Sequence, residues 1–268
     1  MNNIRHHFTK HLQAVEQEEH VRILYACESG SRAWGVHSEA SDYDVRFIYI
    51  RPVEWYLSIF DKRDVIERPI HSAMDINGWD LKKALQLIRK SNPSLLEWLE
   101  SPIVYMERFS VAEQIRSISP LLFSPKSCTY HYLHMAKRNY RIFLQQDQVQ
   151  IKKYFYVLRP ILACQWIEQY RTMPPLEFGV LVERLVPDGS ELKKAIQHLL
   201  DRKKDGGGTT YEPSMIPIHR FLEEKIAYYD KAADAMEARQ EEQDDRLDAL
   251  FRSALKDVWQ TNNQPLQP

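Results

Sequence analysis

The sequence is most informative at Gly30-Ser31-Arg32-Ala33-Trp34-Gly35 and, shortly after it, at Ser41-Asp42-Tyr43-Asp44-Val45-Arg46. An apolar, β-prone run from Val21 to Cys27 precedes the first segment and predicts a strand. Glycine lets the backbone approach a ligand closely, and the serine that follows offers an N–H and a hydroxyl to a phosphate. We therefore predict that Gly30 and Ser31 form a phosphate-binding turn.

The second segment opens another predicted strand, which runs to Ile50. Because side chains alternate between the two faces of a strand, Asp42 and Asp44 should share one face. The other face should point toward a core and carries Tyr43, Val45, Phe47 and Tyr49. Two neighbouring carboxylates repel each other unless a cation lies between them, and Mg²⁺ or Mn²⁺ prefers such oxygen ligands. The pattern predicts a divalent metal site.

A strand, a Gly-Ser turn and an Asp-x-Asp strand in this order resemble the DNA polymerase β-like nucleotidyltransferase superfamily. The resemblance is to the bacterial predicted nucleotidyltransferases associated with RNA-repair pathways. It continues through Asp75-Ile76-Asn77-Gly78-Trp79-Asp80 and Asn92-Pro93, and it extends to Tyr156-Val157-Leu158-Arg159-Pro160. Beyond about residue 190 no motif matches.

The resemblance implies an enzyme that moves a nucleoside monophosphate from a nucleoside triphosphate, such as ATP, to a hydroxyl acceptor. The acceptor could be an RNA or DNA end, a protein or a small molecule. The superfamily pattern also implies a third carboxylate on a neighbouring strand. Asp75 is our first choice and Asp80 the rival, although capping of the helix that follows would also explain Asp80. Asp61 and Asp64 lie in a polar loop and fit less well.

The resemblance assigns roles to individual residues. Asp42, Asp44 and Asp75 would be the catalytic metal ligands, with Asp75 accepting the proton of the acceptor hydroxyl. Ser31 and the backbone of Gly30 would hold the β and γ phosphates, and lysines of the helical half would assist them. The predicted nucleotide-binding residues are Gly30, Ser31, Arg32, Lys137, Lys152, Lys153 and Tyr156.

Several of these assignments leave alternatives open. Arg32 could assist the phosphates or be a solvated turn residue. Lys152 and Lys153 are adjacent, so a helix would point them about 100° apart. We favour Lys153, which lies three residues before Tyr156 on nearly the same face. Arg46 shares the carboxylate face and could pair with Asp44, bind substrate or turn to solvent.

The predicted fold class is α+β, with a small mixed β-sheet nucleotidyltransferase domain at residues 1–110 and an all-helical domain at 111–268. Strands are expected at 21–27, 42–50 and 70–77. Helices are expected at 5–20, 80–90, 125–145, 149–172 and 176–185, then from about 190 to 205 and from 217 to 259. Ser124-Pro125 is a helix start signal, and Pro160 should kink or interrupt its helix.

Charge is distributed unevenly along the predicted helical half. The segment from Lys126 to Arg159 has seven basic residues and one acid, a net charge of +6, and is interleaved with aromatic side chains. Such a stretch can hold phosphates and stack bases, although several of the aromatics should belong to the core. The segment from Phe221 to Asp248 has ten acids and four bases, a net charge of −6, and we expect a solvated helix face there.

Composition excludes several classes of protein. The 268 residues carry a net charge of −1. They contain neither a Gly-x-Ser-x-Gly nor a Gly-x-Gly-x-x-Gly motif, so the sequence does not support a hydrolase, a kinase or a Rossmann fold. No run of 18 apolar residues predicts a membrane span, and residues 1–7 lack the apolar core of a signal peptide. Three separated cysteines fit reduced thiols, so a cytoplasmic location is expected. The alternative function is a catalytically inactive nucleotide-sensing or nucleic-acid-binding module on the same fold.

Overall fold

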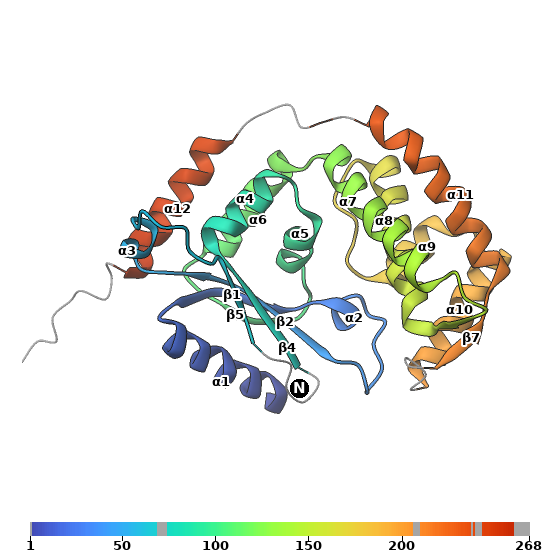
Figure 1. The fold of residues 1–268 in the computed structure, drawn as a ribbon, viewed down its shortest axis with the longest axis horizontal. Coiled ribbons are helices and arrows are strands. Elements are labelled where there is room, and N and C mark those ends of the chain that lie inside the picture. The colour runs from blue at the N-terminus through green and yellow to red at the C-terminus, as the bar shows by residue number, and fades with distance from the viewer. Residues whose placement is uncertain (1, 69–73, 206–209, 237, 239–242, 260–268) are drawn as a thin grey trace, which may run out of the picture.

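The computed structural model describes residues 2–68, 74–205, 210–236, 238 and 243–259. Its centre is a mixed sheet of five strands with the order β3-β4-β2-β1-β5 (Figure 1). The strands are β1 (Arg22–Glu28), β2 (Tyr43–Ile50), β3 (Val65–Glu67), β4 (Met74–Asp80) and β5 (Val104–Glu107). β2 and β4 are parallel, and the other neighbours are antiparallel. The α+β class with a mixed sheet is confirmed, whereas the short strands β3 and β5 were not predicted.

Helix α1 (Asn2–Glu19) covers one face of the sheet, as Figure 1 shows. Phe8, Leu12 and Val15 of α1 are buried in a cluster with side chains of β1, β2, β4 and β5. The β2 members of this cluster are Val45, Phe47 and Tyr49, and Tyr43 packs against it. The predicted alternation of β2 is therefore confirmed, and the other face of the strand carries Asp44 and Arg46, followed by the buried Ile48 and Ile50.

The opposite face of the sheet is covered by α4 (Leu81–Arg89), α5 (Pro93–Leu99) and α6 (Val111–Leu122). Each of the first two begins at a side-chain cap. The Asp80 carboxylate accepts from the Lys82 N–H, and the Asn92 side chain accepts from the Leu95 N–H. Trp79 stacks on Trp98 with ring centroids 3.8 Å apart, which joins β4 to α5.

The short helices α2 (Gly30–Ala33) and α3 (Val53–Tyr56) follow β1 and β2. The second half contains α7 (Pro125–Phe143), α8 (Ile151–Tyr170), α9 (Phe178–Leu185), α10 (Glu191–Lys204) and α11 (Ile216–Ala232). Pro160 lies inside α8, which continues as one helix. The half is not wholly helical as predicted, because β6 (Gln148–Gln150) and β7 (Tyr211–Pro213) pair there.

The predicted single helix at 217–259 was wrong. After α11 and the 3₁₀ turn η2 (Ala233–Ala235), Met236 adopts an extended backbone with ψ of 149°, which cannot continue a helix. Helix α12 (Asp244–Trp259) then lies against α4 and α6, beside the sheet and away from α7–α11 (Figure 1).

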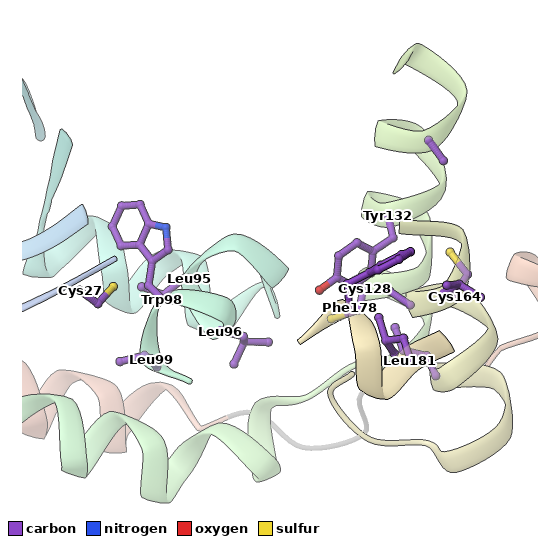
Figure 2. Close-up of a cluster of buried hydrophobic side chains, with 14 of the residues drawn as sticks. Cys27, Leu95, Leu96, Trp98, Leu99, Cys128, Tyr132, Cys164, Phe178 and Leu181 are labelled. Atoms are coloured by element: carbon purple, nitrogen blue, oxygen red, sulfur yellow. The ribbon is translucent and has the colours of Figure 1, made fainter. Parts of the chain in front are cut away.

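One hydrophobic core connects the two halves. Figure 2 shows Leu95, Leu96, Trp98 and Leu99 on one side and Tyr132, Phe178 and Leu181 on the other, all members of the same buried cluster. Arg159, which is 1% exposed, donates to Glu97 at 2.6 Å, and Tyr132 donates to the same carboxylate. A division at residues 110 and 111 stays a prediction, and the helices α6 and α12 from beyond it pack on the sheet side.

The described acids of the acidic segment are exposed, apart from the half-buried Asp244, as predicted, and two of them also contact α7. Asp230 of α11 pairs with Lys137 of α7 at 2.7 Å, and Asp234 accepts hydrogen bonds from Tyr130 and, through its carbonyl, from Lys126. One exposed ion pair and two hydrogen bonds therefore link α11 and η2 to α7. The three cysteines are buried free thiols, in agreement with the sequence. None of the helices in the described part of the chain has the length and apolarity to cross a membrane.

Candidate functional site

Two carboxylates meet where β2 and β4 run side by side. In this parallel pair Asp44 lies directly opposite Asp75. The guanidinium of Arg46 joins them, since its Nη2 donates to Asp44 Oδ1 at 3.0 Å and to Asp75 Oδ2 at 2.8 Å. The two oxygens therefore lie within two hydrogen-bond lengths of each other. Of the alternatives for Arg46, pairing with Asp44 is the one observed.

The register also separates Asp75 from its rival. Asp80 lies at the far end of β4, opposite Tyr49, where its carboxylate caps α4 and accepts a hydrogen bond from Tyr56 at 2.8 Å. Asp64 forms an ion pair with Lys83. Asp75 is thus the carboxylate of β4 that the fold brings to Asp44.

Gly30 is required by the position of Asp44. Its φ of +58° lies in the left-handed region, and a Cβ at this residue would stand 2.1 Å from Asp44 Oδ2. The Asp44 carboxylate therefore lies against the α-carbon of Gly30, and the N–H of Ser29 donates to the Asp44 carbonyl at 2.8 Å. The glycine-serine turn and the Asp-x-Asp strand form one local unit, with Ser31 partly buried in it.

Glu28, at the end of β1, contacts this unit through hydrogen bonds and was not identified from the sequence. It is fully buried, its carboxylate accepts from the Asp44 N–H at 2.8 Å, and Tyr105 of β5 donates a hydrogen bond to it. Burial raises the pKa of Glu28, against the effect of the Tyr105 hydrogen bond. A glutamate that ends an apolar strand just before Ser29-Gly30 was the available signal.

Arg32 holds the loop that leads into β2. Its guanidinium donates to the carbonyls of Ser41 at 2.7 Å and of Asp42 at 3.2 Å and lies 3.7 Å from the ring centroid of Tyr43. These contacts hold the exposed Asp42 directly before the first residue of β2. Arg32 therefore fixes the loop before β2, the strand that carries Asp44, and its contact with phosphates stays a prediction.

The three predicted carboxylates act on one another electrostatically. Burial raises the pKa of Asp44; the Arg46 guanidinium opposes this shift, and the charges of Asp75 and Asp42 add to it. The charges of Asp42 and Asp75 make the surroundings of Asp44 favour positive charge, which Arg46 supplies.

Tyr156 of α8 reaches this site from the second half of the chain. Its ring lies edge-on to Trp34, with centroids 6.1 Å apart, and Trp34 follows α2 directly. The pKa of Tyr156 is raised first by burial and then by the charges of Asp44 and Asp42. The fold thus brings Tyr156 to Trp34 beside α2, and its role in nucleotide binding stays a prediction.

The three candidate lysines have different surroundings. Lys153 lies 5.3 Å from the ring centroid of Tyr156 and 3.8 Å from that of Phe143, on the same side of α8 as Tyr156. Lys152 is half-buried at the start of α8. Lys137 pairs with Asp230 and is not brought to the carboxylates. A fourth lysine, Lys203 of α10, is buried against the Phe155 ring and was not identified from the sequence.

The oxygen atoms of Asp44 and Asp75 are the groups that would have to bind a divalent cation at this site. Carboxylate oxygens suit Mg²⁺ and Mn²⁺, and Asp44 Oδ2 packs against Gly30, where a Cβ would stand 2.1 Å from it. Within the described residues, no three histidine, cysteine, aspartate or glutamate side chains are gathered closely enough to form a metal centre. Asp44 and Asp75 are instead bridged by Arg46, so their chemistry fits a cation while their arrangement holds a guanidinium.

Known proteins provide an independent comparison. Residues 4–253 match the model of the family described as RlaP, RNA repair pathway DNA polymerase beta family. The chain is 50% identical over 248 residues to the Bacillus subtilis (strain 168) protein named Uncharacterized protein YcgL, which covers 92% of this chain and 95% of that protein.

Among solved structures, a nucleotidyltransferase-like protein from Exiguobacterium sibiricum 255-15 is 10% identical, with a TM-score of 0.30, over 93% of this chain and 89% of that one. This likeness is too low to add to the family match. Since the family model spans nearly the whole chain and includes both the Gly30 turn and the Asp44–Asp75 pair, the chain belongs to the RNA repair pathway DNA polymerase beta family.

Proposed function

We propose that this protein is a metal-dependent nucleotidyltransferase that moves a nucleoside monophosphate from a nucleoside triphosphate to a hydroxyl acceptor. The observation that carries the proposal is the pairing of Asp44 with Asp75 across parallel strands, with Gly30 packed against Asp44. Membership of the polymerase β-type family supports the same chemistry.

Asp42, Asp44 and Asp75 would hold Mg²⁺ or Mn²⁺, which would polarise the α-phosphate and stabilise the pyrophosphate leaving group. The acceptor oxygen attacks the α-phosphorus, and the bond from this phosphorus to the oxygen that bridges to the β-phosphate breaks. Asp75 is the proposed acceptor of the hydroxyl proton, because it is more exposed than Asp44, with 38% of its side chain accessible against 29%.

The other residues orient the nucleotide. The hydroxyl of Ser31 and the backbone at Gly30 would receive the β and γ phosphates, where no side chain of residue 30 intervenes. Trp34 and Tyr156 present two aromatic rings beside the carboxylates, and such rings can stack a base. Lys153, above the Tyr156 ring, adds a cation on the same side.

An RNA end is the acceptor that we favour, because the family is described by an RNA repair pathway. The reaction should be tested with each α-labelled nucleoside triphosphate, Mg²⁺ or Mn²⁺, and RNA, DNA and protein acceptors, with the mass of the product measured. A product with DNA or protein alone would replace the RNA assignment.

The matched variants are Asp42→Asn with Asp44→Asn against Asp61→Asn, a loop aspartate that lies outside the site. We expect the double variant to lose transfer and Mn²⁺ binding, measured by calorimetry, and the Asp61 variant to keep both. Unchanged Mn²⁺ affinity in the double variant would place the cations elsewhere and overturn the assignment.

The second candidate is a catalytically inactive nucleotide-sensing or nucleic-acid-binding module. The bridge from Arg46 to both Asp44 and Asp75 favours it, because a guanidinium already balances these charges. Nucleotide binding without any labelled product, unaffected by the Asp42 and Asp44 substitutions, would support this candidate over the enzyme.

A further inference from the structure

A cavity of about 490 Å³ lies at the edge of the sheet where β5 is the last strand. Its lining comes from four separate segments, which are the first turn of α1, the loop around α2, the start of β2 and the residues that lead into β5. Small-ligand sites in proteins commonly have this size, with mostly apolar walls and a few polar groups. The cavity is therefore a candidate for a second ligand site.

The lining of this cavity carries positive charge. Arg5, Arg32 and His37 belong to it, and none of its residues is an aspartate or glutamate within the part of the chain that the structure describes. The Arg5 guanidinium forms neither an ion pair nor a hydrogen bond with a described residue. Arg32 donates only to the backbone carbonyls of Ser41 and Asp42, so neither guanidinium has a carboxylate partner there. The cavity thus presents unbalanced positive charge to a ligand.

Aromatic packing fixes both guanidinium groups beside the cavity. Phe8 of α1 packs against the lining residues Tyr43 and Tyr105, with ring centroids 5.1 and 4.9 Å apart. Arg5 precedes Phe8 by three residues and therefore lies on the same side of α1. The Arg32 guanidinium lies 3.7 Å from the centroid of the Tyr43 ring. The sequence places these cations far apart, and the packing of α1 on the sheet brings them to one cavity.

The remaining wall of the cavity is apolar. It includes Ile4, which is 39% exposed, and Ile103, which is 37% exposed, together with Val104. An organic anion with a flat apolar group would contact both kinds of wall. A nucleoside monophosphate has this chemistry, because its phosphate can accept paired hydrogen bonds from guanidinium groups and its base can lie against apolar side chains.

The cavity is distinct from the carboxylate site. Its lining contains none of Asp42, Asp44 and Asp75. Tyr43 packs on the α1 side of the sheet, whereas the neighbouring Asp44 lies on the opposite face of β2. Arg32 connects the two places, since it lines the cavity and also holds the Asp42 carbonyl at 3.2 Å.

We propose that this cavity binds a nucleoside monophosphate unit, with the phosphate on Arg5 and Arg32 and the base against Ile103 and Val104. The unit is supplied either by a free mononucleotide or by one nucleotide of a single-stranded RNA. The choice of a nucleotide as the ligand rests on the proposed function, whereas the cavity and its charge do not.

The site is tested by calorimetry without metal, with AMP and with a short single-stranded RNA as separate probes. We expect Arg5→Met to weaken binding by about tenfold to a hundredfold, because it removes a charge-assisted hydrogen bond. Ile103→Glu should have a similar effect, since its carboxylate would compete for the guanidinium groups. Lys10→Met, which removes a like charge from an exposed position of α1 outside the lining, is the control and should bind as the unmodified protein does.

The two probes identify the source of the unit. A loss for AMP alone indicates a free mononucleotide, a loss for RNA alone indicates a strand, and a loss for both means that the cavity accepts either. Ser31→Ala separates the cavity from the Gly30 turn, because a ligand held in the cavity should keep its affinity in that variant. Affinity that falls only in Ser31→Ala, or an unmodified protein that binds neither probe, would show that the proposal is wrong.

Folding is controlled by urea denaturation, in which Arg5→Met should be as stable as the unmodified protein because Arg5 is exposed. Should Ile103→Glu not fold, Arg5→Glu introduces the same charge from an exposed residue. Cavity-dependent binding in a protein that transfers no nucleotide would support the site and count against the proposed enzyme alone. Nucleotide transfer with unchanged AMP and RNA affinity in the folded variants would overturn the site and leave the proposed function standing.

Discussion

Replacing Gly30 by alanine should damage the site because two costs coincide at this residue. The φ of +58° places an L-residue in the left-handed region, at a cost of about 1–2 kcal/mol. The new Cβ would also stand 2.1 Å from Asp44 Oδ2, whereas real Cβ atoms essentially never approach other atoms within 3.0 Å. Forced repacking of this kind costs about 1–3 kcal/mol, so the total loss of stability should be about 2–5 kcal/mol.

The chain contains a matched control five residues away. Gly35 has a φ of +71°, but a Cβ there would meet nothing within 4 Å. Gly35→Ala should therefore carry the conformational cost alone, about 1–2 kcal/mol. The difference between the two variants isolates the contact with Asp44 from the strain of the backbone.

Both variants should be measured by urea denaturation and by calorimetry with Mn²⁺. Gly30→Ala must push the Asp44 carboxylate away from its position, so we expect its Mn²⁺ affinity to fall by about tenfold or more, which corresponds to about 1.4 kcal/mol. Gly35→Ala should keep the affinity of the unmodified protein. Equal stability and equal Mn²⁺ affinity in the two variants would refute the argument that Gly30 makes room for Asp44.

Three other predictions concern stability and ligand contacts. Burial raises the pKa of Asp80 from 3.8 to about 6, so this residue should make the free energy of unfolding fall by about 2 kcal/mol between pH 4.5 and pH 7; Asp80→Asn should remove that fall in urea titrations at these two pH values. Arg159→Met should lower the free energy of unfolding by about 3–5 kcal/mol, because it leaves Glu97 with an uncompensated charge. Adding Glu97→Gln should recover part of this loss, and purely additive effects of the two substitutions would contradict the prediction. Lys137→Ala should leave the affinity for ATP unchanged in calorimetry, because the Lys137 ammonium pairs with Asp230 of α11. Tyr156→Ala should lower the affinity for ATP by about tenfold in the same assay. A loss of affinity in the Lys137 variant and none in the Tyr156 variant would exchange the roles of these residues.

Local patterns in the sequence were sufficient for the parts of the fold that depend on neighbouring residues. The alternation along β2 predicted that Val45, Phe47 and Tyr49 face a core, and the α1 cluster confirms it. The cap at Asp80 and the start of α7 at Ser124-Pro125 were equally local, because a capping side chain binds N–H groups two or three residues away.

The site depended on contacts between distant segments, which no local pattern encodes. The pairing of Asp44 with Asp75 is set by the register of two strands 31 residues apart, and the bridge from Arg46 follows from that register. The ion pair of Lys137 with Asp230 joins α7 to α11 across 93 residues of sequence, so a lysine suited to a phosphate is committed to a carboxylate instead.

Burial was the other quantity that the sequence could not supply. Glu28 and Lys203 look like ordinary charged residues in the chain, yet both are almost completely enclosed in the structure. The sequence alone identified the carboxylates, the glycine-serine turn and the aromatic side chains that we propose for the site. Only the tertiary structure decided which of them meet and which are shielded from water, because register and enclosure arise when strands and helices far apart in the chain pack together.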